Sequence, residues 1–575
     1  MTPPTLLLTS TTTALIIGGG PSGLTSALLL ASHGIKCTIV ERHITRTTSS
    51  LKAHAINPRS LEIFRQLGLD TARLRSQGLP PSDGDTVRFA ISMAGRELGS
   101  LPYERQGAET LRITAEPLFN VPQPVLERWL LDAVERRSEL VEYYQGMQWE
   151  DCDYTSSSEN GENGDARGLL TSTLTSRTTK TTHTITSRYI LDCSGAHSRA
   201  RAKLHIPFEP LPEYIQNEVH HVSVHIRADL RKFKPATLLW AVSPRVEGTF
   251  ICYGRSTDSV FVTYYDPNVT PREKFSEEAI GEKTPYEIQS ITVWSTWPRT
   301  AETYSSPRFP SAAFVVGDAA HAFPPTGGLG VNTGIADAHN LVWKIAAVEK
   351  GWTGGGLLST YNTERRPIAV ANARQSVKNQ VKLHALKEAL RDPPDEGAGE
   401  EYVRWKARLN AELESNREHF DSINLQIGKQ EGGEEGGEEG GGSLVRPCDV
   451  YIPSGVPGAR LPHTWISLPG KNSTGPVSVL DLVEGTSFTL FIAAGTTRDQ
   501  PGFSAVGEFP VPIRVLRLGV EFDVADREWV DIVGLSGDGQ GQEKGLLVRP
   551  DQHILGNVGS IADVEALLKR LLSAQ

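Results

Sequence analysis

The chain of 575 residues is poor in cysteine, in long apolar runs and in excess positive charge. Its cysteines show no paired spacing, which argues against a disulfide framework, a zinc site or a CxxC redox motif. No apolar run reaches the roughly 20 residues that a membrane-spanning helix needs. We therefore expect a cytoplasmic protein with reduced thiols, no metal site and no membrane span.

The charge balance excludes a further class of partner. The formal net charge is −10, and no basic patch stands out along the chain, so we expect no nucleic-acid partner. Hydrophobic residues make up 38% of the chain, which suits a globular protein. A chain of this length is too long for one hydrophobic core, so several domains are expected.

A glycine-rich turn between two short apolar runs is the first motif. Residues 12–17 are typical of a buried strand, residues 18–23 have the GxGxxG pattern, residues 24–32 suit a helix, and a second strand ends at Glu41. In such a unit the glycines allow a tight turn and the approach of a pyrophosphate, while the acidic residue binds ribose hydroxyls. The pattern predicts a Rossmann-type dinucleotide site. The cofactor-binding residues expected there are Gly18, Gly20, Pro21, Ser22, Gly23, Glu41 and Arg42.

A second glycine-rich stretch covers residues 317–332, between an apolar run at 312–316 and a helix expected over 333–350. Its aspartate can accept hydrogen bonds from sugar hydroxyls, and its glycines let backbone N–H groups approach a flat ligand. The stretch predicts the floor of a nucleotide-cofactor pocket. The cofactor-binding residues expected in it are Asp318, Gly328, Gly330, Val331 and Asn332.

Two other helix starts carry polar residues of interest. Asn57 and Pro58 predict a helix that ends near Gly68, with Arg59 in its first turn, where the helix dipole does not favour a cation. This mismatch suggests a contact with a cofactor phosphate, although a solvated surface arginine explains it as well. Gln123 stands just before the first turn of another expected helix.

The rest of the chain divides by composition. Period-two alternation over 218–298 predicts an antiparallel sheet, and the Ser/Thr-rich residues 155–187 predict a hairpin with a long mobile excursion. A Gly/Glu run at 431–442 predicts a linker. Strands at 488–492, 513–517 and 545–550, with a helix over 561–572, predict a small α/β domain. The cofactor domain is expected over 1–205, with local substrate-domain segments inside that range, and over 299–385. The inserted sheet is expected over 206–298, a helical segment over 386–427, the linker over 428–444 and the last domain over 445–575.

With these motifs the chain resembles the class A FAD-dependent monooxygenases, the aromatic hydroxylases of the p-hydroxybenzoate hydroxylase fold. Within them it is most similar to the phenol hydroxylase and dichlorophenol monooxygenase branch. The resemblance rests on both glycine-rich stretches, on the segment around Gln123 and on the loop AHAINPR at 53–59. It implies an α/β fold with a Rossmann-type FAD-binding domain, an inserted antiparallel substrate-domain sheet and a C-terminal thioredoxin-like domain. In the family that last domain makes homodimer contacts.

The resemblance implies FAD as cofactor, NADPH or NADH as electron donor, and O₂ with a small aromatic molecule as substrates. Oxygen would reach an electron-rich ring, typically a phenol, through a C4a-hydroperoxyflavin. Arg59 and Gln123 would contact FAD, and Pro325, Gly327 and Gly328 would line the reactive face of the flavin through backbone groups. A base for the phenol needs hydrogen-bond reach of the substrate. The candidates are His54 and Tyr253.

One position departs from the family pattern. The motif between the two flavin stretches should read DGAHS, whereas this chain has Ser194 before GAHS, with Asp192 two residues earlier. The departure bears on the nicotinamide step, and two alternatives stay open on the same fold. One is Baeyer–Villiger or epoxidising oxygen transfer, and the other is a flavoprotein without oxygenase activity.

Overall fold

The structure is a computed structural model. It describes residues 10–45, 54–155, 168–211, 219–243, 246–254, 258–265, 275–428, 448–470, 475–493, 509–536 and 544–573. The centre of the predicted excursion and nearly all of the predicted linker lie outside these residues. No helix in the described part of the chain is both long and apolar enough to cross a membrane.

A seven-stranded sheet, called the central sheet below, has the order β7-β2-β1-β10-β9-β8, with β18 also pairing with β10. Strands β7, β2, β1, β10 and β18 are parallel, while β9 and β8 continue the sheet in antiparallel fashion. Their bounds are β1 (Thr11–Ile17), β2 (Cys37–Glu41), β7 (Val141–Gln145), β8 (Met147–Tyr154), β9 (Leu170–Ser176), β10 (Thr182–Asp192) and β18 (Ala313–Val315).

Strand β10 is a single strand of 11 residues. Its first half has threonines that alternate with more buried residues, and it pairs with β9. Threonine is β-branched and favours a strand, so the polar first half continues without a break into the apolar second half.

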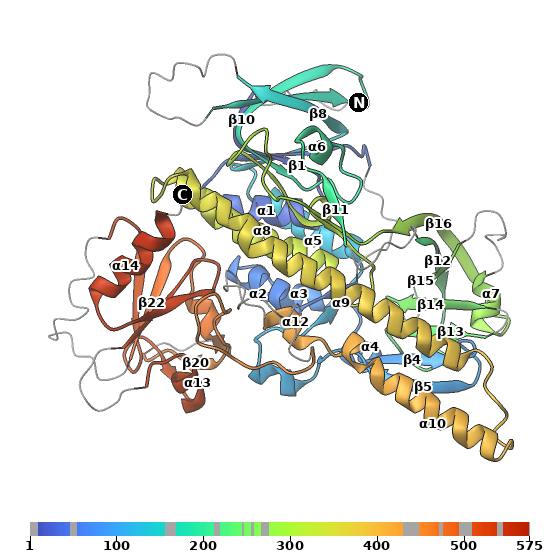
Figure 1. Ribbon diagram of the computed structural model, residues 1–575. Coiled ribbons are helices and arrows are strands. Elements are labelled where there is room, and N and C mark those ends of the chain that lie inside the picture. Colours follow the sequence, from blue (N-terminus) through green and yellow to red (C-terminus); the bar gives the residue numbers. More distant parts are fainter. Residues whose placement is uncertain are drawn as a thin grey trace.

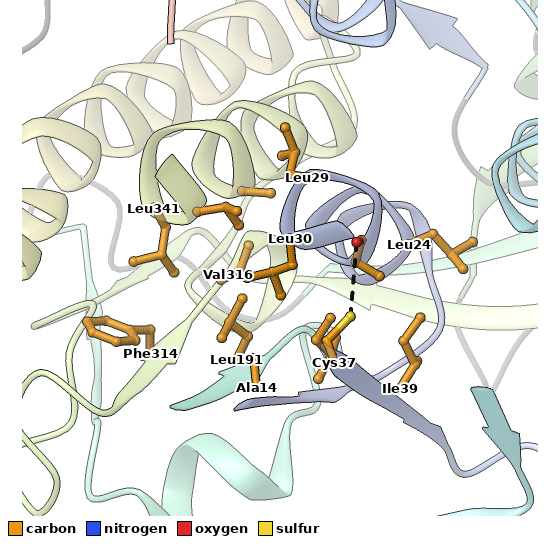
Figure 2. Packing of buried hydrophobic residues seen from close by; sticks show 14 of the residues in the cluster. Ala14, Leu24, Leu29, Leu30, Cys37, Ile39, Leu191, Phe314, Val316 and Leu341 are labelled. Atoms are coloured by element: carbon orange, nitrogen blue, oxygen red, sulfur yellow. Dashed lines mark hydrogen bonds between the residues drawn. The ribbon is translucent and has the colours of Figure 1, made fainter. Parts of the chain in front are cut away.

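Two helices cover one face of this sheet. Figure 2 shows Leu24, Leu29 and Leu30 of α1 (Pro21–Ser32) with Leu341 of α8 (Gly330–Glu349), above strand residues such as Ala14, Ile39 and Leu191. Helix α1 begins at Pro21, earlier than the expected Leu24, because proline suits the first helical position. The other helices are α2 (Pro58–Gln66), α3 (Thr71–Arg75), α4 (Pro81–Gly84), α5 (Gln123–Glu135), α6 (Arg199–Lys203), α7 (Phe275–Ile280), α9 (Thr360–Leu390), α10 (Glu400–Ser415), α11 (Arg417–Phe420), α12 (Ile423–Ile427), α13 (Arg527–Ile532) and α14 (Ile561–Leu572).

A second seven-stranded sheet has the order β16-β12-β15-β14-β13-β4-β5. All its pairings are antiparallel except that of β13 with β4. Two of its strands, β4 and β5, come from well before residue 206, in the range where local substrate-domain segments were expected. The bounds are β4 (Thr86–Ala90), β5 (Glu97–Pro102), β12 (Val219–Ala228), β13 (Leu238–Val242), β14 (Glu247–Cys252), β15 (Asp258–Tyr264) and β16 (Tyr286–Thr296).

The C-terminal region has a four-stranded sheet in the order β23-β22-β25-β26. One face of it packs with α14 against Trp343 and Ala347 of α8.

The long helix α9 connects the parts of the molecule (Figure 1). Its first turns reach the C-terminal region through Glu364, and its last turns pack on β4 and β5. The bounds are β20 (Trp465–Ser467), β21 (Val477–Ser478), β22 (Phe488–Ile492), β23 (Ile513–Arg517), β24 (Asp523–Val524), β25 (Gly545–Val548) and β26 (Ile554–Val558), and the short strands elsewhere are β3 (Ala55–Ile56), β6 (Phe119–Asn120), β11 (Phe208–Pro210), β17 (Arg299–Ala301) and β19 (His321–Ala322).

Candidate active site

The site lies at the carboxyl edge of the central sheet. Because β1, β2, β10 and β18 are parallel, their C-terminal ends meet at one edge. Strand β1 leads into Gly18, β2 ends at Glu41, β10 ends at Asp192, and β18 leads through Val316 into Gly317. The two glycine-rich stretches predicted from the sequence are therefore brought together, at the edge where open α/β sheets bind their ligands.

The GxGxxG turn has the shape that a dinucleotide requires. Gly18 has φ +107°, and a Cβ there would lie 2.5 Å from the carbonyl oxygen of Cys193. A Cβ on Gly23 would overlap the carbonyl oxygen of Gly18, so both positions exclude any larger residue. At Gly20, by contrast, an added Cβ would meet no atom within 4 Å. The backbone at Gly20 is thus open to a ligand, as the approach of a pyrophosphate demands.

The acidic residue of the motif is held against the same turn. Glu41 Oε2 accepts the backbone N–H of Gly19 over 2.8 Å, and Oε1 accepts that of His43 over 2.8 Å. Helix α1 has no side-chain cap and no acidic residue in its first turn. Its N-terminal N–H groups and the positive end of its dipole can therefore serve a phosphate. Arg42 is exposed beside this turn.

Ser22 joins the two glycine-rich stretches. Gly317 has φ +65°, and a Cβ on it would lie 2.5 Å from Ser22 Oγ. A Cβ on Gly334, in the second turn of α8, would overlap the same hydroxyl oxygen. The start of α1 and the start of α8 therefore pack closely through small residues, which sets the second stretch beside the first.

The second stretch presents its aspartate and its glycine turn outward. Asp318 is exposed within the short 3₁₀ turn Gly317–Ala319, and Pro325 is exposed a few residues later. Gly327 has φ +101° and Gly328 has φ +61°, so both favour glycine. A Cβ on Gly328 would lie 3.1 Å from Cβ of Ala55, which places the turn directly against the residue after His54.

The side chain of Asn332 makes four hydrogen bonds within the protein. Its Oδ1 accepts the Asn57 N–H at 2.9 Å and the Ser60 hydroxyl at 2.8 Å, while its Nδ2 donates to the carbonyls of Ala55 at 2.9 Å and Gly328 at 2.8 Å. These four bonds use the hydrogen-bonding capacity of the amide. A cofactor contact at Asn332, like those predicted at Gly330 and Val331, would have to come from the backbone.

Arg59 is turned toward the C-terminal region. Its guanidinium donates to Gln552 Oε1 at 2.6 Å and to the carbonyl of Asp551 at 2.7 Å, and it lies 3.5 Å from the Glu62 carboxylate. These partners account for a buried cation in the first turn of α2 without a cofactor phosphate. Gln123 is the first residue of α5, and its Nε2 donates to Glu127 Oε1 at 2.7 Å. The FAD contacts of both residues stay predictions.

His54 and Tyr253, the two candidate bases, lie together. Their rings are 6.2 Å apart in an edge-to-face arrangement, and the ring of Tyr103 is 6.1 Å from that of His54. The hydroxyl of Tyr253 is buried without a hydrogen-bond partner in the described structure. Burial raises the pKa of this phenol, so it stays protonated near neutral pH. Tyr103 was missed in the sequence because nothing in its local pattern marks it.

A chain of hydrogen bonds sets the tautomer of His54. The Thr237 hydroxyl donates to the Gly84 carbonyl at 2.6 Å, so its oxygen can accept from Asn120 Nδ2 at 3.5 Å. Asn120 then turns its Oδ1 to His54 Nδ1, 3.0 Å away, and that nitrogen must carry the proton. Nε2 is left as an acceptor. Burial lowers the pKa of His54, against the opposing effect of Asn120, so the imidazole is neutral near pH 7.

Ser194, the position that departs from the family pattern, is hydrogen-bonded to Asp192 in the same turn. Asp192 is fully buried, and its Oδ1 accepts both the N–H of Ser194 at 3.0 Å and its hydroxyl at 2.6 Å. Its Oδ2 accepts the hydroxyl of Ser198 at 2.5 Å. Burial raises the pKa of Asp192, while the serine hydrogen bonds act against this. The carboxylate therefore lies inside the turn instead of on its surface.

The residues at this edge fit FAD. The open backbone at Gly20, the uncapped start of α1 and the carboxylate of Glu41 suit the ADP part of the cofactor. The exposed Asp318 and the glycine turn that follows suit the sugar-alcohol chain and the flat ring system.

Comparison with known proteins agrees with this fit. Residues 11–376 match the family described as FAD binding domain. The chain is 26% identical to 2,4-dichlorophenol 6-monooxygenase of Delftia acidovorans, over 96% of this chain and 97% of that protein. It is 28% identical to phenol 2-monooxygenase of a Pseudomonas species, over 96% of this chain and 91% of that protein.

A solved structure is similar over the same length. The flavin-dependent monooxygenase PieE, in complex with FAD and substrate, superimposes with a TM-score of 0.84 at 26% identity, covering 98% of this chain and 99% of that one. The match of the family over most of the chain, and of whole monooxygenases from end to end, agrees with the geometry of the two glycine-rich stretches. The chain belongs to the FAD-binding-domain family and is an FAD-dependent monooxygenase that takes its electrons from NADPH or NADH.

Proposed function

We propose that the enzyme hydroxylates a phenolic or other electron-rich aromatic ring beside the glycine turn 327–328, with His54 Nε2 as the acceptor for the substrate hydroxyl. The observation that carries the proposal is the neutral imidazole with its tautomer set by Asn120, next to this turn. An acceptor in this place can take the proton of a phenol, and the resulting phenolate is a more electron-rich ring.

Tyr253 complements His54. A buried hydroxyl without a partner lowers stability by roughly 1–3 kcal/mol, which a ligand can recover by supplying a hydrogen bond. The Tyr253 hydroxyl is in this state and belongs to the ring adjacent to His54. A substrate with two oxygen substituents would meet both groups at once, so Tyr253 is proposed to orient the substrate and His54 to hold its proton.

The remaining proposed site residues bind and shield the cofactor. Bound FAD supplies the redox chemistry, carrying electrons from NADPH or NADH to O₂. Asp318 would accept hydrogen bonds from the sugar-alcohol chain, and the backbone of Pro325, Gly327 and Gly328 would cover the reacting face of the ring system. A covered face matters because water in the site diverts oxygen into side reactions.

The relatives support an aromatic substrate. Those named above act on 2,4-dichlorophenol and phenol. A tetracenomycin A2 monooxygenase-dioxygenase of Streptomyces glaucescens is 27% identical over 92% of this chain and 90% of that protein, which favours a role in secondary metabolism as well as aromatic catabolism.

Four finer features belong to the same proposal. The sheet order β23-β22-β25-β26, with one parallel and two antiparallel pairings, supports a thioredoxin-like domain over 445–575. As in the family that the sequence resembles, we place a homodimer contact on this domain and keep the predicted domain limits. The free cysteines of the described structure support a cytoplasmic location.

Turnover under ¹⁸O₂ tests the proposal. FAD-loaded enzyme is mixed with NADPH or NADH and a panel of phenols and phenolic polycycles, and products are analysed by mass spectrometry. We expect at least one phenol to accelerate NAD(P)H oxidation and to gain one labelled oxygen on its ring. Lactone or epoxide products would contradict the proposal. So would a result in which none of the compounds accelerates reduction of the flavin.

Substitution of His54 tests the assigned acceptor. His54→Gln should bind FAD normally but lower kcat/KM about 100-fold or more, as loss of a general base does. The matched control is His43→Gln, a half-exposed histidine beside Glu41. Because burial lowers the pKa of His54, wild-type kcat/KM should remain level as pH falls through 6.5, the usual value for histidine. A decline centred at or above pH 6.5 would assign the proton to another group.

A further inference from the structure

Tyr103 is the third ring beside the proposed acceptor. Its ring lies 6.1 Å from that of His54, and the ring of Tyr253 lies 6.2 Å from that of His54. Tyr103 directly follows β5, the last strand of the second sheet, whereas His54 directly precedes β3 and Tyr253 directly follows β14. Three segments far apart in the sequence therefore bring one aromatic residue each to this place.

The backbone around Tyr103 is fixed on both sides. Its N–H donates to the carbonyl of Asp85 at 2.7 Å, and its carbonyl accepts Gln106 Nε2 at 2.9 Å. The next residue, Glu104, has φ +51°, and its N–H donates to the carbonyl of Phe420 at 2.5 Å. The Phe420 ring lies 6.5 Å from the Tyr103 ring. The Tyr103 side chain is thus oriented before any ligand binds.

The hydroxyl of Tyr103 has no protein partner and is not closed off. The residue is 5% exposed and packs in a hydrophobic cluster with Leu118 and Leu238. Its hydroxyl makes no hydrogen bond to any residue in the described part of the chain, and it stays accessible, in contrast to the buried hydroxyl of Tyr253. Phenylalanine would fill the same space, so packing does not require the hydroxyl. A ligand can supply the hydrogen bond that the protein does not.

The protonation state makes this hydroxyl a donor. Burial, with the Glu104 carboxyl and the Tyr253 phenol nearby, raises the pKa of Tyr103 well above the usual value of a phenol. The Tyr103 hydroxyl therefore keeps its proton at neutral pH and can donate it to an oxygen atom. The adjacent Glu104 carboxyl disfavours a negatively charged group at this place. The matching acceptor is an uncharged oxygen, such as that of a ketone.

We propose that Tyr103 determines substrate specificity by donating a hydrogen bond to an uncharged oxygen substituent, such as a ketone, on the phenolic substrate. The inference rests on the proposed function, because it requires the phenol to lie at His54. His54 then accepts from the phenolic hydroxyl, and Tyr103 binds the second oxygen. A substrate without that oxygen leaves the buried donor unpaired, and this is the kind of contact that discriminates between substrates of equal size.

Calorimetric titration of FAD-loaded enzyme at pH 7, without NADPH or NADH, tests the proposal independently of turnover. The ligands are hydroxyacetophenones and the matching isopropylphenols, in their meta and para forms, which have nearly the same size but differ in the carbonyl oxygen. In Tyr103→Phe the ketone of at least one pair should bind about tenfold more weakly, as loss of one buried hydrogen bond does. The affinity for its isopropylphenol should stay unchanged.

Two further variants serve as comparisons. Tyr402→Phe removes the same atom from a half-buried tyrosine of α10, outside the proposed site, and should bind all the ligands as wild type does. His54→Gln should weaken ketone and isopropylphenol alike, because both ligands carry the phenolic hydroxyl. Since the Tyr103 hydroxyl has no protein partner, Tyr103→Phe should keep the wild-type Tm. Should it fail to fold, Tyr103→Leu, which also lacks the hydroxyl, takes its place.

Any of three results would overturn the role of Tyr103. The first is an unchanged affinity of Tyr103→Phe for every ketone that wild type binds. The second is an equal loss for ketone and isopropylphenol, which would mark a packing role. The third is tighter binding of the matching hydroxybenzoates than of the ketones by wild type. If His54→Gln still lowers kcat/KM, these results leave the proposed function standing. Failure of wild type to bind or hydroxylate any phenol would contradict both.

Discussion

The backbone N–H of Asn57 donates to Asn332 Oδ1 across 2.9 Å, joining two helix starts that lie 275 residues apart in the sequence. The same amide also holds the carbonyls of Ala55 and Gly328. The loop that carries His54 and the glycine turn proposed to cover the flavin are therefore held by one buried side chain. If the proposed site residues are right, Asn332 supports both cofactor binding and substrate binding.

Replacing Asn332 tests the support directly. Asn332→Leu keeps the approximate volume but leaves the buried N–H of Asn57 and two carbonyls without their partner, at roughly 1–3 kcal/mol for each group. We expect a large fall in Tm and loss of FAD on gel filtration, with Asn410→Leu on the exposed face of α10 as control. Wild-type stability in Asn332→Leu would show that water or a local shift replaces these bonds.

Asp318 is expected to hold the cofactor through its sugar hydroxyls. Asp318→Ala removes the acceptor, so the protein should purify with far less FAD while its fold, measured by circular dichroism, is unchanged. Asp392→Ala, another exposed aspartate, is the control. Full flavin absorbance in purified Asp318→Ala would contradict the assignment of this residue.

A buried ion pair docks the C-terminal region on α2. Arg460 donates to Glu62 through Nε at 2.8 Å and Nη2 at 2.5 Å, and both side chains are 1% exposed. Arg460→Met should destabilise the protein by about 3–5 kcal/mol, because it leaves a buried carboxylate without its main partner. The double variant Arg460→Met/Glu62→Leu should recover most of this loss. Thermal unfolding of the four proteins of the cycle measures the coupling, and additive effects would argue against it.

Because of the titration of Glu104, the free energy of unfolding should fall as pH rises. Burial raises its pKa to about 7, against hydrogen bonds from Ser422 and Gln426 that favour the charged form. The folded state thus holds a proton that the unfolded chain has lost above its usual value of 4.5. The stabilisation is complete below pH 4.5 and is lost as pH rises through 7, by on the order of 3 kcal/mol.

The amide of Glu104→Gln stays neutral, so this variant should be more stable than wild type at pH 8 and should lack the decline between pH 5 and 8. Its oxygen can still accept from Ser422 N–H and Gln426 Nε2, which lie 2.9 Å from Glu104 Oε2. Glu139→Gln, at an exposed position, serves as control. The measurement is Tm across this pH range, and parallel curves for Glu104→Gln and wild type would contradict the shifted pKa.

Restoring the family aspartate at position 194 should not by itself speed the reduction of the flavin. Ser194→Asp replaces a hydroxyl that donates to Asp192 with a second carboxylate, and it removes a hydrogen bond of 2.6 Å. We expect a lower Tm and no faster reduction of the flavin by NADPH or NADH. The exchange Asp192→Ser/Ser194→Asp leaves a single carboxylate in the turn and should recover stability. Faster flavin reduction in the single variant would show instead that Ser194 limits the nicotinamide step.

Local patterns predicted the elements that have strong local signals. The strands expected at 488–492 and 513–517 and the helix at 561–572 have these limits in the structure. The first half of β10 lies within the hairpin predicted over 155–187, but its alternation of threonine with histidine, isoleucine and serine is a weak contrast in hydrophobicity, so the limits of the strand were not predicted. Strands β4 and β5 could not be assigned to the second sheet, since β4 joins it through β13, which is far along the chain, and β5 joins it through β4.

The site shows the same division. Sequence alone predicted a dinucleotide-type cofactor, because a tight turn needs glycine at positive φ and a close approach needs the absence of a Cβ, and the sequence shows glycine at both places. The resemblance to the family then implied FAD. Only the tertiary structure decided that Asn332 joins two loops, that Arg59 bonds the C-terminal region and that His54 and Tyr253 share one place. In each case the contacting residues lie far apart in the sequence. The identity of a side chain does not specify which distant residue the fold will place beside it.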